Sequence, residues 1–275
     1  MYWIIRGEGN GVCIKNLMKL IIVLALVIVS TSSLFTYAYE PAEASNENVN
    51  NNFKVCIDPG HQAKYDSRGE PVAPGSSTKK ARVSAGTKGV ATKKNEYEVN
   101  LEAALLLREM LNNKSYNVIM TRDNNDVNIS NIERAEIANE NNSDIAIRIH
   151  CDSLLDSSKT GATILVPNKE CEWTKEIYEN SYTFATILQE KLKEGNIKVN
   201  GVFERKDITG FNWSKVPVII LEMGFMSNYN EDTMLSNPNY QKKIMNCVSE
   251  AIDEYQNVMI CLLYTSPSPR DISGS

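Results

Sequence analysis

Two kinds of apolar pattern alternate along the middle of this chain, and the alternation limits the folds available to it. Short runs rich in Val and Ile indicate strands, and longer segments with helical spacing of apolar residues indicate helices. The predicted strands cover 53–58, 116–122, 144–150, 161–167, 197–206 and 215–224. The predicted helices cover 96–113, 130–142, 173–194 and 238–255. We therefore predict a single α/β domain whose mixed, mostly parallel sheet of about six strands is flanked by helices.

The N-terminal segment has the pattern of a secretory signal. Two lysines precede an apolar run at 20–29, which is short for a membrane span, and TYA at 36–38 offers a cleavage site. We predict a signal peptide over 1–38, and the alternative is an uncleaved membrane anchor. An internal methionine begins a more typical signal than Met1 does, so residues 1–17 are interpreted as the result of a start codon assigned too early.

The segments on either side of the predicted domain are not predicted to belong to its fold. Residues 39–52 are polar and are predicted to form a flexible linker to a domain spanning 53–256. Residues 257–275 are predicted to be a tail. Within it, 261–275 resemble the translation of a transposase adapter used in sequencing libraries, so we exclude them from the prediction of the fold.

Charge and cysteine content exclude some classes of function. The formal net charge is -5, which argues against a nucleic-acid-binding protein. Within the predicted domain the cysteines are Cys56, Cys151, Cys171 and Cys247. They form no CxxC pair, so no structural zinc knuckle is predicted. An exported protein can form one or two disulfides from them, but spacing alone does not give the pairing.

The chain has only two histidines, and both lie at the end of a predicted strand. His61 follows the strand at 53–58, and His150 ends the strand at 144–150. Glu222 lies near the end of the last predicted strand. Sites in open α/β sheets form beyond the carboxyl ends of parallel strands, so these three side chains are expected to converge.

A catalytic zinc ion commonly has three protein ligands, and two histidines are therefore one ligand short. The third must come from a carboxylate. The candidates near a predicted strand end or helix start are Asp58, Asp66, Glu70, Glu96, Glu98 and Asp152. Composition and spacing do not choose among them.

Four sequence blocks resemble a known family. They are IDPGH at 57–61, EYEVNL at 96–101, ERAEIANENNSDIAIRIHCD at 133–152 and PVIILEMGFMSN at 217–228. In this order they are similar to the zinc-dependent N-acetylmuramoyl-L-alanine amidases, the cell-wall hydrolases often called amidase type 3. The resemblance spans most of the predicted domain.

The resemblance implies a role for each candidate residue. His61, Glu96 and His150 correspond to the ligands of one zinc ion, and Glu222 corresponds to the catalytic glutamate. Arg134 and Asn139 also match positions of the family and are interpreted as structural or supporting residues.

Three departures from the family concern the surroundings of these residues. His61 is followed by QAKYD rather than by glycines, the connection to Glu96 is long, and Cys151-Asp152 replaces the common Ala-Asn pair. These differences affect the expected substrate preference more than metal binding.

The implied function is hydrolysis of the amide bond between N-acetylmuramic acid and L-alanine in peptidoglycan. The implied enzyme is secreted or associated with the cell wall and is expected to be a monomer that meets the membrane only through its signal segment. A zinc peptidase that cuts within the stem peptide is the alternative, because the same metal chemistry serves both reactions. A catalytically inactive wall-binding module is a third possibility, but such a module would be expected to lack one of the four site residues.

Overall fold

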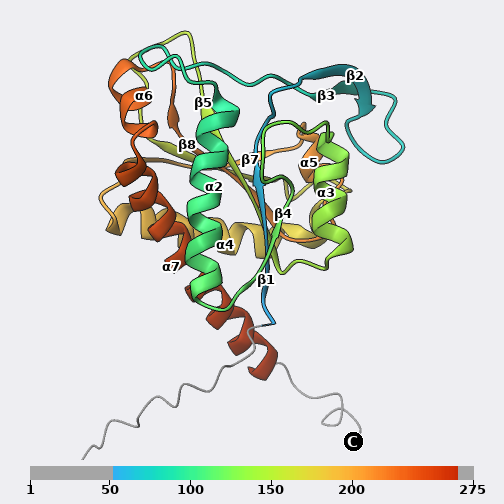
Figure 1. Ribbon diagram of the computed structural model, residues 1–275. Helices are drawn as coiled ribbons and strands as arrows, with labels where there is room; N and C mark the ends of the chain where they lie inside the picture. Colours follow the sequence, from blue (N-terminus) through green and yellow to red (C-terminus); the bar gives the residue numbers. More distant parts are fainter. Residues whose placement is uncertain (1–51, 266–275) are drawn as a thin grey trace, which may run out of the picture. The chain divides into compact units, whose positions relative to one another are not determined.

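A computed structural model describes residues 52–265 (Figure 1). The strands are β1 (Lys54–Pro59), β2 (Asp66–Pro71), β3 (Lys79–Val83), β4 (Asn117–Met120), β5 (Ile145–Asp152), β6 (Ala162–Pro167), β7 (Val199–Arg205) and β8 (Val218–Phe225). The helices are α2 (Glu96–Asn113), α3 (Asn131–Glu140), α4 (Lys175–Glu194), α5 (Thr209–Asn212), α6 (Tyr229–Leu235) and α7 (Pro238–Thr265).

Six strands form one mixed sheet in the order β4-β1-β5-β8-β6-β7. Strands β4, β1, β5 and β8 are parallel neighbours, β6 runs antiparallel to β8, and β7 is parallel to β6. The predicted α/β fold with a mixed, mostly parallel sheet is confirmed, and each predicted strand and helix is present. The important consequence is that β1, β5 and β8, which carry or precede the candidate site residues, are adjacent.

The two faces of the sheet are covered unequally. Strand side chains alternate between faces, and Ile147 and Ile149 of β5 join the main core with apolar residues of α2, α4 and α7. A smaller core on the opposite face includes Ala146, together with residues of α3 and α5. Arg148 and His150 therefore point toward the less covered face, where a substrate has access.

The start of α2 is fixed by a reciprocal cap. The Glu98 carboxylate accepts a hydrogen bond from the backbone N–H of Asn95 at 2.8 Å. This cap stabilises the helix from its first residue, Glu96. The predicted cap of α3 is also present, with the Ser130 hydroxyl accepting from the backbone N–H of Glu133 at 3.2 Å.

The long polar connection at 59–94 contains a two-stranded sheet that the sequence did not predict. Strands β2 and β3 pair antiparallel with an irregular register. Their side chains are largely exposed, so the hydrophobic alternation that identifies a half-buried strand is missing. From β3 the chain crosses the top of the molecule to the start of α2 (Figure 1).

Helix α7 is longer than predicted, because it continues past residue 255 to Thr265. Residues 256–262 contain neither Gly nor Pro, so nothing in them stops a helix. The predicted signal peptide at 1–38, nearly all of the linker at 39–52, and residues 266–275 lie outside the described residues. Within residues 52–265, no helix is long and apolar enough to cross a membrane.

The four cysteines of the predicted domain are buried thiols that form no disulfide. Burial raises the pKa of the Cys56 and Cys151 thiols well above their ordinary value. Cys56 and Cys151 are therefore small core residues at neutral pH rather than thiolate ligands or nucleophiles.

Candidate active site

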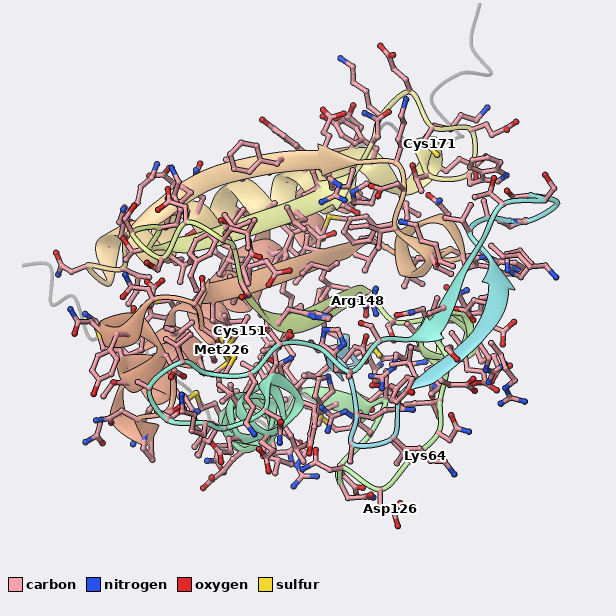
Figure 2. All side chains as sticks on the ribbon, turned by 90° about the horizontal axis from the view of Figure 1, so that it is seen from above. Lys64, Asp126, Arg148, Cys151, Cys171 and Met226 are labelled. Carbon is pink, nitrogen blue, oxygen red and sulfur yellow. The ribbon has the colours of Figure 1, made fainter. Side chains whose placement is uncertain are left out.

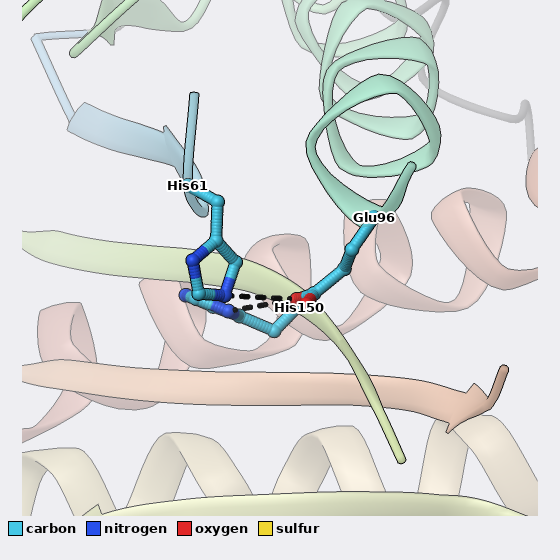
Figure 3. A group of neighbouring side chains, drawn as sticks. All are labelled: His61, Glu96 and His150. Atoms are coloured by element: carbon cyan, nitrogen blue, oxygen red, sulfur yellow. Dashed lines mark hydrogen bonds and ion pairs between the residues drawn. The ribbon is translucent and has the colours of Figure 1, made fainter. Parts of the chain in front are cut away.

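Three side chains from distant parts of the sequence meet at the carboxyl edge of the sheet (Figure 3). His61 follows β1, His150 lies near the end of β5, and Glu96 is the first residue of α2. One potential ligand atom from each lies within 4.8 Å of the others. The structure thus selects Glu96 among the acidic candidates that spacing had left open.

The spacing of these atoms suits a metal ion. His61 Nε2 and His150 Nδ1 each lie 3.2 Å from Glu96 Oε1. Neighbouring ligands of a tetrahedral zinc ion lie roughly 3.4 Å apart, since zinc–ligand bonds are about 2.1 Å long. The imidazole rings are nearly perpendicular, with centroids 4.8 Å apart. Two imidazole nitrogens and one carboxylate oxygen therefore form a donor set that zinc accepts.

His61 is held from both its backbone and its ring. Its φ of 59° lies in the left-handed region, which is uncommon outside glycine. Arg134 donates to its carbonyl oxygen at 3.0 Å. Its Nδ1 lies 2.9 Å from the carbonyl oxygen of Ser84 and 3.0 Å from the Ser84 hydroxyl. A partner for Nδ1 orients a ligating histidine so that Nε2 faces the metal.

Glu96 has both carboxylate oxygens engaged. Oε2 accepts from the backbone N–H of Thr87 at 2.9 Å, and Oε1 accepts from Asn100 Nδ2 and from the backbone N–H of Cys151, both at 3.2 Å. Burial alone would raise the pKa of Glu96, but hydrogen bonding to His150 and His61 outweighs it and holds this pKa well below the ordinary value. The carboxylate is therefore ionised, as a ligand requires.

His150 packs directly against the backbone of Gly60. A Cβ at residue 60 would lie 2.2 Å from Cε1 of the His150 ring, so only glycine leaves room for it. Burial lowers the pKa of His150 to about 4, which keeps the imidazole neutral and able to bind a metal ion at neutral pH. Its Nε2 is buried and has no hydrogen-bond partner among the described residues.

Glu222 lies beside this cluster on the neighbouring strand. It is in register with His150 across β5 and β8, and the alternation places both on the same face of the sheet. Burial, followed by the negative charges of Glu96 and Asp152, raises the pKa of Glu222 well above its ordinary value. Its Oε2 is buried and has no partner among residues 52–265. It is a carboxyl group with an oxygen available to exchange a proton.

The remaining acidic candidates have other structural roles. Asp58 is buried between Arg134 and Arg148, at 2.6 and 2.7 Å. Asp66 pairs with two surface arginines, and Glu98 caps α2. Glu70 is buried against the start of α3, and Asp152 is partly exposed near Glu222. The structure brings none of these five into the cluster of three ligand candidates.

Most of the residues that support the cluster are not predictable from the sequence. Arg134 was singled out and does hold the chain around His61, whereas Asn139 ties α3 to the segment around Trp213. Ser84 and Thr87 lie in a polar connection without periodicity and gave no local signal. Gly60 is part of the IDPGH block. The sequence shows a glycine next to His61, but it does not show that the backbone of this glycine packs against His150.

Residues 55–254 match the family described as N-acetylmuramoyl-L-alanine amidase. A putative N-acetylmuramoyl-L-alanine amidase of Buchnera aphidicola is 27% identical, and the match covers 58% of this chain and 84% of the relative. The N-acetylmuramoyl-L-alanine amidase of Mycobacterium tuberculosis is 26% identical, with 72% of this chain and 84% of the relative covered.

Solved structures share the fold. The N-acetylmuramyl-L-alanine amidase Ami1 of Mycobacterium abscessus matches with a TM-score of 0.68 at 24% identity, covering 75% of this chain and 99% of that one. Ami1 of Mycobacterium smegmatis matches with a TM-score of 0.69 at 22% identity, covering 76% and 99%. Since the family match spans most of the chain, the protein belongs to the N-acetylmuramoyl-L-alanine amidase family.

Proposed function

We propose that this chain is a zinc-dependent enzyme that hydrolyses the amide bond between N-acetylmuramic acid and L-alanine of peptidoglycan. The observation that carries the proposal is the convergence of His61, Glu96 and His150 at one sheet edge, with Glu222 in register beside them. The substrate lies outside the cytoplasmic membrane, and the predicted signal peptide is consistent with action there.

His61, Glu96 and His150 are the proposed zinc ligands. Their donor atoms are two imidazole nitrogens and one carboxylate oxygen, a set used by catalytic zinc sites with a further position for water or substrate. Zinc in such a site polarises a carbonyl group and makes a neighbouring water a stronger acid. The contacts from Ser84, Thr87 and the Asn100 amide hold the ligands in place.

Glu222 is the proposed general base and then general acid. Its Oε2 accepts a proton from the attacking water as the water oxygen bonds to the carbonyl carbon. The carbon–nitrogen bond then breaks, and Glu222 delivers the proton to the departing nitrogen of L-alanine. Burial and the negative charges of Glu96 and Asp152 raise its pKa, which favours the protonated form that donates to the departing nitrogen.

Digestion of purified cell wall tests the reaction directly. The full chain with zinc is expected to release free L-alanine N-termini, and a chelator is expected to abolish the release. Mass spectrometry of the products separates the two enzymatic candidates, because an amidase leaves intact stem peptides and a peptidase leaves shortened ones. No release under zinc-replete conditions would refute the proposed function.

A further inference from the structure

An open pocket of about 380 Å³ adjoins the proposed metal site. It lies between β3, the start of α3 and the segment after β7, and it is lined by Lys80, Ala81, Ser84, Asn131, Asp207, Ile208 and Thr209. Ser84 joins the pocket to the site, because its carbonyl oxygen and hydroxyl both contact Nδ1 of His61. The pocket therefore adjoins the proposed metal site on the Nδ1 side of the His61 ring.

One wall of the pocket is fixed by partly buried polar contacts of Asn131. The Asn131 amide oxygen accepts from Arg148 Nη2 at 2.9 Å, and its nitrogen donates to the Arg82 carbonyl oxygen at 2.8 Å. Arg148 comes from β5, two residues before His150, and is labelled in the view from above (Figure 2). Asn131, which lines the pocket, is thus tied by this hydrogen bond to the strand that carries His150.

Lys80 and Asp207 line the pocket, and with the adjacent Arg205 they form a group of two cations and one carboxylate. Asp207 accepts from Arg205 Nε and Nη2 at 2.8 and 3.0 Å, and from Lys80 Nζ at 3.1 Å. Two cations share one carboxylate here, although the whole chain has a formal net charge of -5. Because Arg205 neutralises Asp207, the charge of Lys80 is available to another anion.

Lys80 is also accessible. Its side chain is 44% exposed, and that of Asp207 is 49% exposed. An ammonium group has three N–H donors, and two of them point to the Asp207 carboxylate and carbonyl oxygens. One donor remains for a ligand while Asp207 keeps the lysine in place over the pocket.

We propose that this pocket is a subsite for a carboxylate of the peptidoglycan stem peptide, bound by Lys80 and positioned by Asp207 and Arg205. The inference rests on the proposed function and adds which side of the substrate enters the pocket. The lactyl carboxyl of the sugar is consumed in the amide bond, so the free carboxylates of the substrate lie on its peptide side. The free carboxylate nearest the cleaved bond is the α-carboxylate of the second residue, and this is the group that we assign to the pocket.

The test compares two stem tripeptides that differ in one group. They are L-alanyl-γ-D-glutamyl-L-lysine and its counterpart in which the α-carboxylate of the second residue is a carboxamide. Their dissociation constants are measured by calorimetry at low salt with the zinc-loaded full chain. Wild-type protein is expected to bind the free acid at least about fivefold more tightly, in line with a charge-assisted hydrogen bond at a partly exposed site.

Lys80→Gln is expected to bind both peptides equally. Lys79→Gln is the matched control, since it removes the same charge one residue earlier from a side chain that lies over Gly69 and does not line the pocket. The control is expected to keep the wild-type ratio. Equal binding of the two peptides by wild type, binding of neither, or an unchanged ratio in Lys80→Gln would each overturn the subsite.

Failure of the subsite is distinguishable from failure of the proposed function. If the chain digests cell wall but does not discriminate between the peptides, the subsite alone is wrong. If it discriminates through Lys80 but releases no L-alanine N-termini, the subsite stands and the proposed reaction is wrong.

Discussion

Replacing Gly60 with alanine tests how the proposed metal site is assembled. The added Cβ would lie 2.2, 2.3 and 2.5 Å from Cε1, Nε2 and Nδ1 of His150. Carbon atoms in contact are normally about 3.5 Å apart or more, so the ring or the backbone of β1 must move by about 1 Å. A shift of the His150 ring away from residue 60 would change its 3.2 Å contact with Glu96.

The size of the effect follows from this displacement. Forcing an extra methyl group into a packed region destabilises a protein by about 1–3 kcal/mol. Loss of ligand orientation weakens metal binding by about 10- to 100-fold, even when only a supporting residue is changed. A displacement of about 1 Å lowers turnover by about 100-fold. Gly60→Ala is therefore expected to bind zinc more weakly and to turn over more slowly than wild type. Both losses are expected to be larger than the fraction of unfolded protein would cause.

Gly69→Ala is the control for Gly60→Ala. Its Cβ would lie 3.2 Å from Cβ and Cδ of the exposed Lys79, a tight contact but a much milder one than the 2.2 Å clash at residue 60. Both variants reduce the entropy of the unfolded chain in the same way, so the comparison isolates the clash with His150. Urea unfolding with a chelator measures stability, competitive zinc titration measures zinc affinity, and wall digestion measures activity. Wild-type zinc affinity in Gly60→Ala would refute the packing argument.

Three further changes test the acid–base group, the metal and the buried ion pairs. Glu222→Gln is expected to retain zinc and lower wall digestion by at least about 100-fold, and wild-type turnover would contradict its role. Chelation is expected to lower Tm, since zinc at 100 times its Kd adds about 2.7 kcal/mol to stability; an unchanged Tm would argue against a folded-state site. Burial alone would raise the pKa of Asp58, but Arg134 and Arg148 hold this pKa well below its ordinary value. Its contribution is therefore present above an unfolded pKa of about 4 and is lost as pH falls below that value. Asp58→Asn is expected to cost about 3–5 kcal/mol at pH 7 and much less at low pH, and an equal loss of stability at both pH values by urea unfolding would refute this assignment.

The main sheet was predictable because its strands are buried and short, and helices separate most of them along the chain. The positions of His61, His150 and Glu222 at strand ends were also visible, since parallel strands bring their carboxyl ends together. Glu96 was different. The residues alone left several carboxylates open, and its assignment came from the resemblance of EYEVNL to the amidase family before the structure placed it in the cluster.

The supports of the site were not predictable because they act across long separations in the sequence. Ser84 contacts a histidine 23 residues earlier, and Lys80 meets Asp207 across 127 residues. Neither contact leaves a periodic pattern. Both depend on the β2–β3 hairpin, whose exposed strands lack the apolar alternation from which the other strands were predicted.

Strand β5 shows why the fold and the site cannot be separated. Its odd-numbered residues, including Ile147 and Ile149, are buried in the main core, and its even-numbered residues lie on the opposite face, which carries the smaller core and the site. Among the latter, Arg148 pairs with Asp58 of β1 and holds Asn131, while His150 joins the ligand cluster. A shift of β5 by one residue would exchange these two sets, burying charge in the core and removing the histidine from the site. The register that stabilises the domain is therefore the same register that aligns His150 with its neighbours in the site.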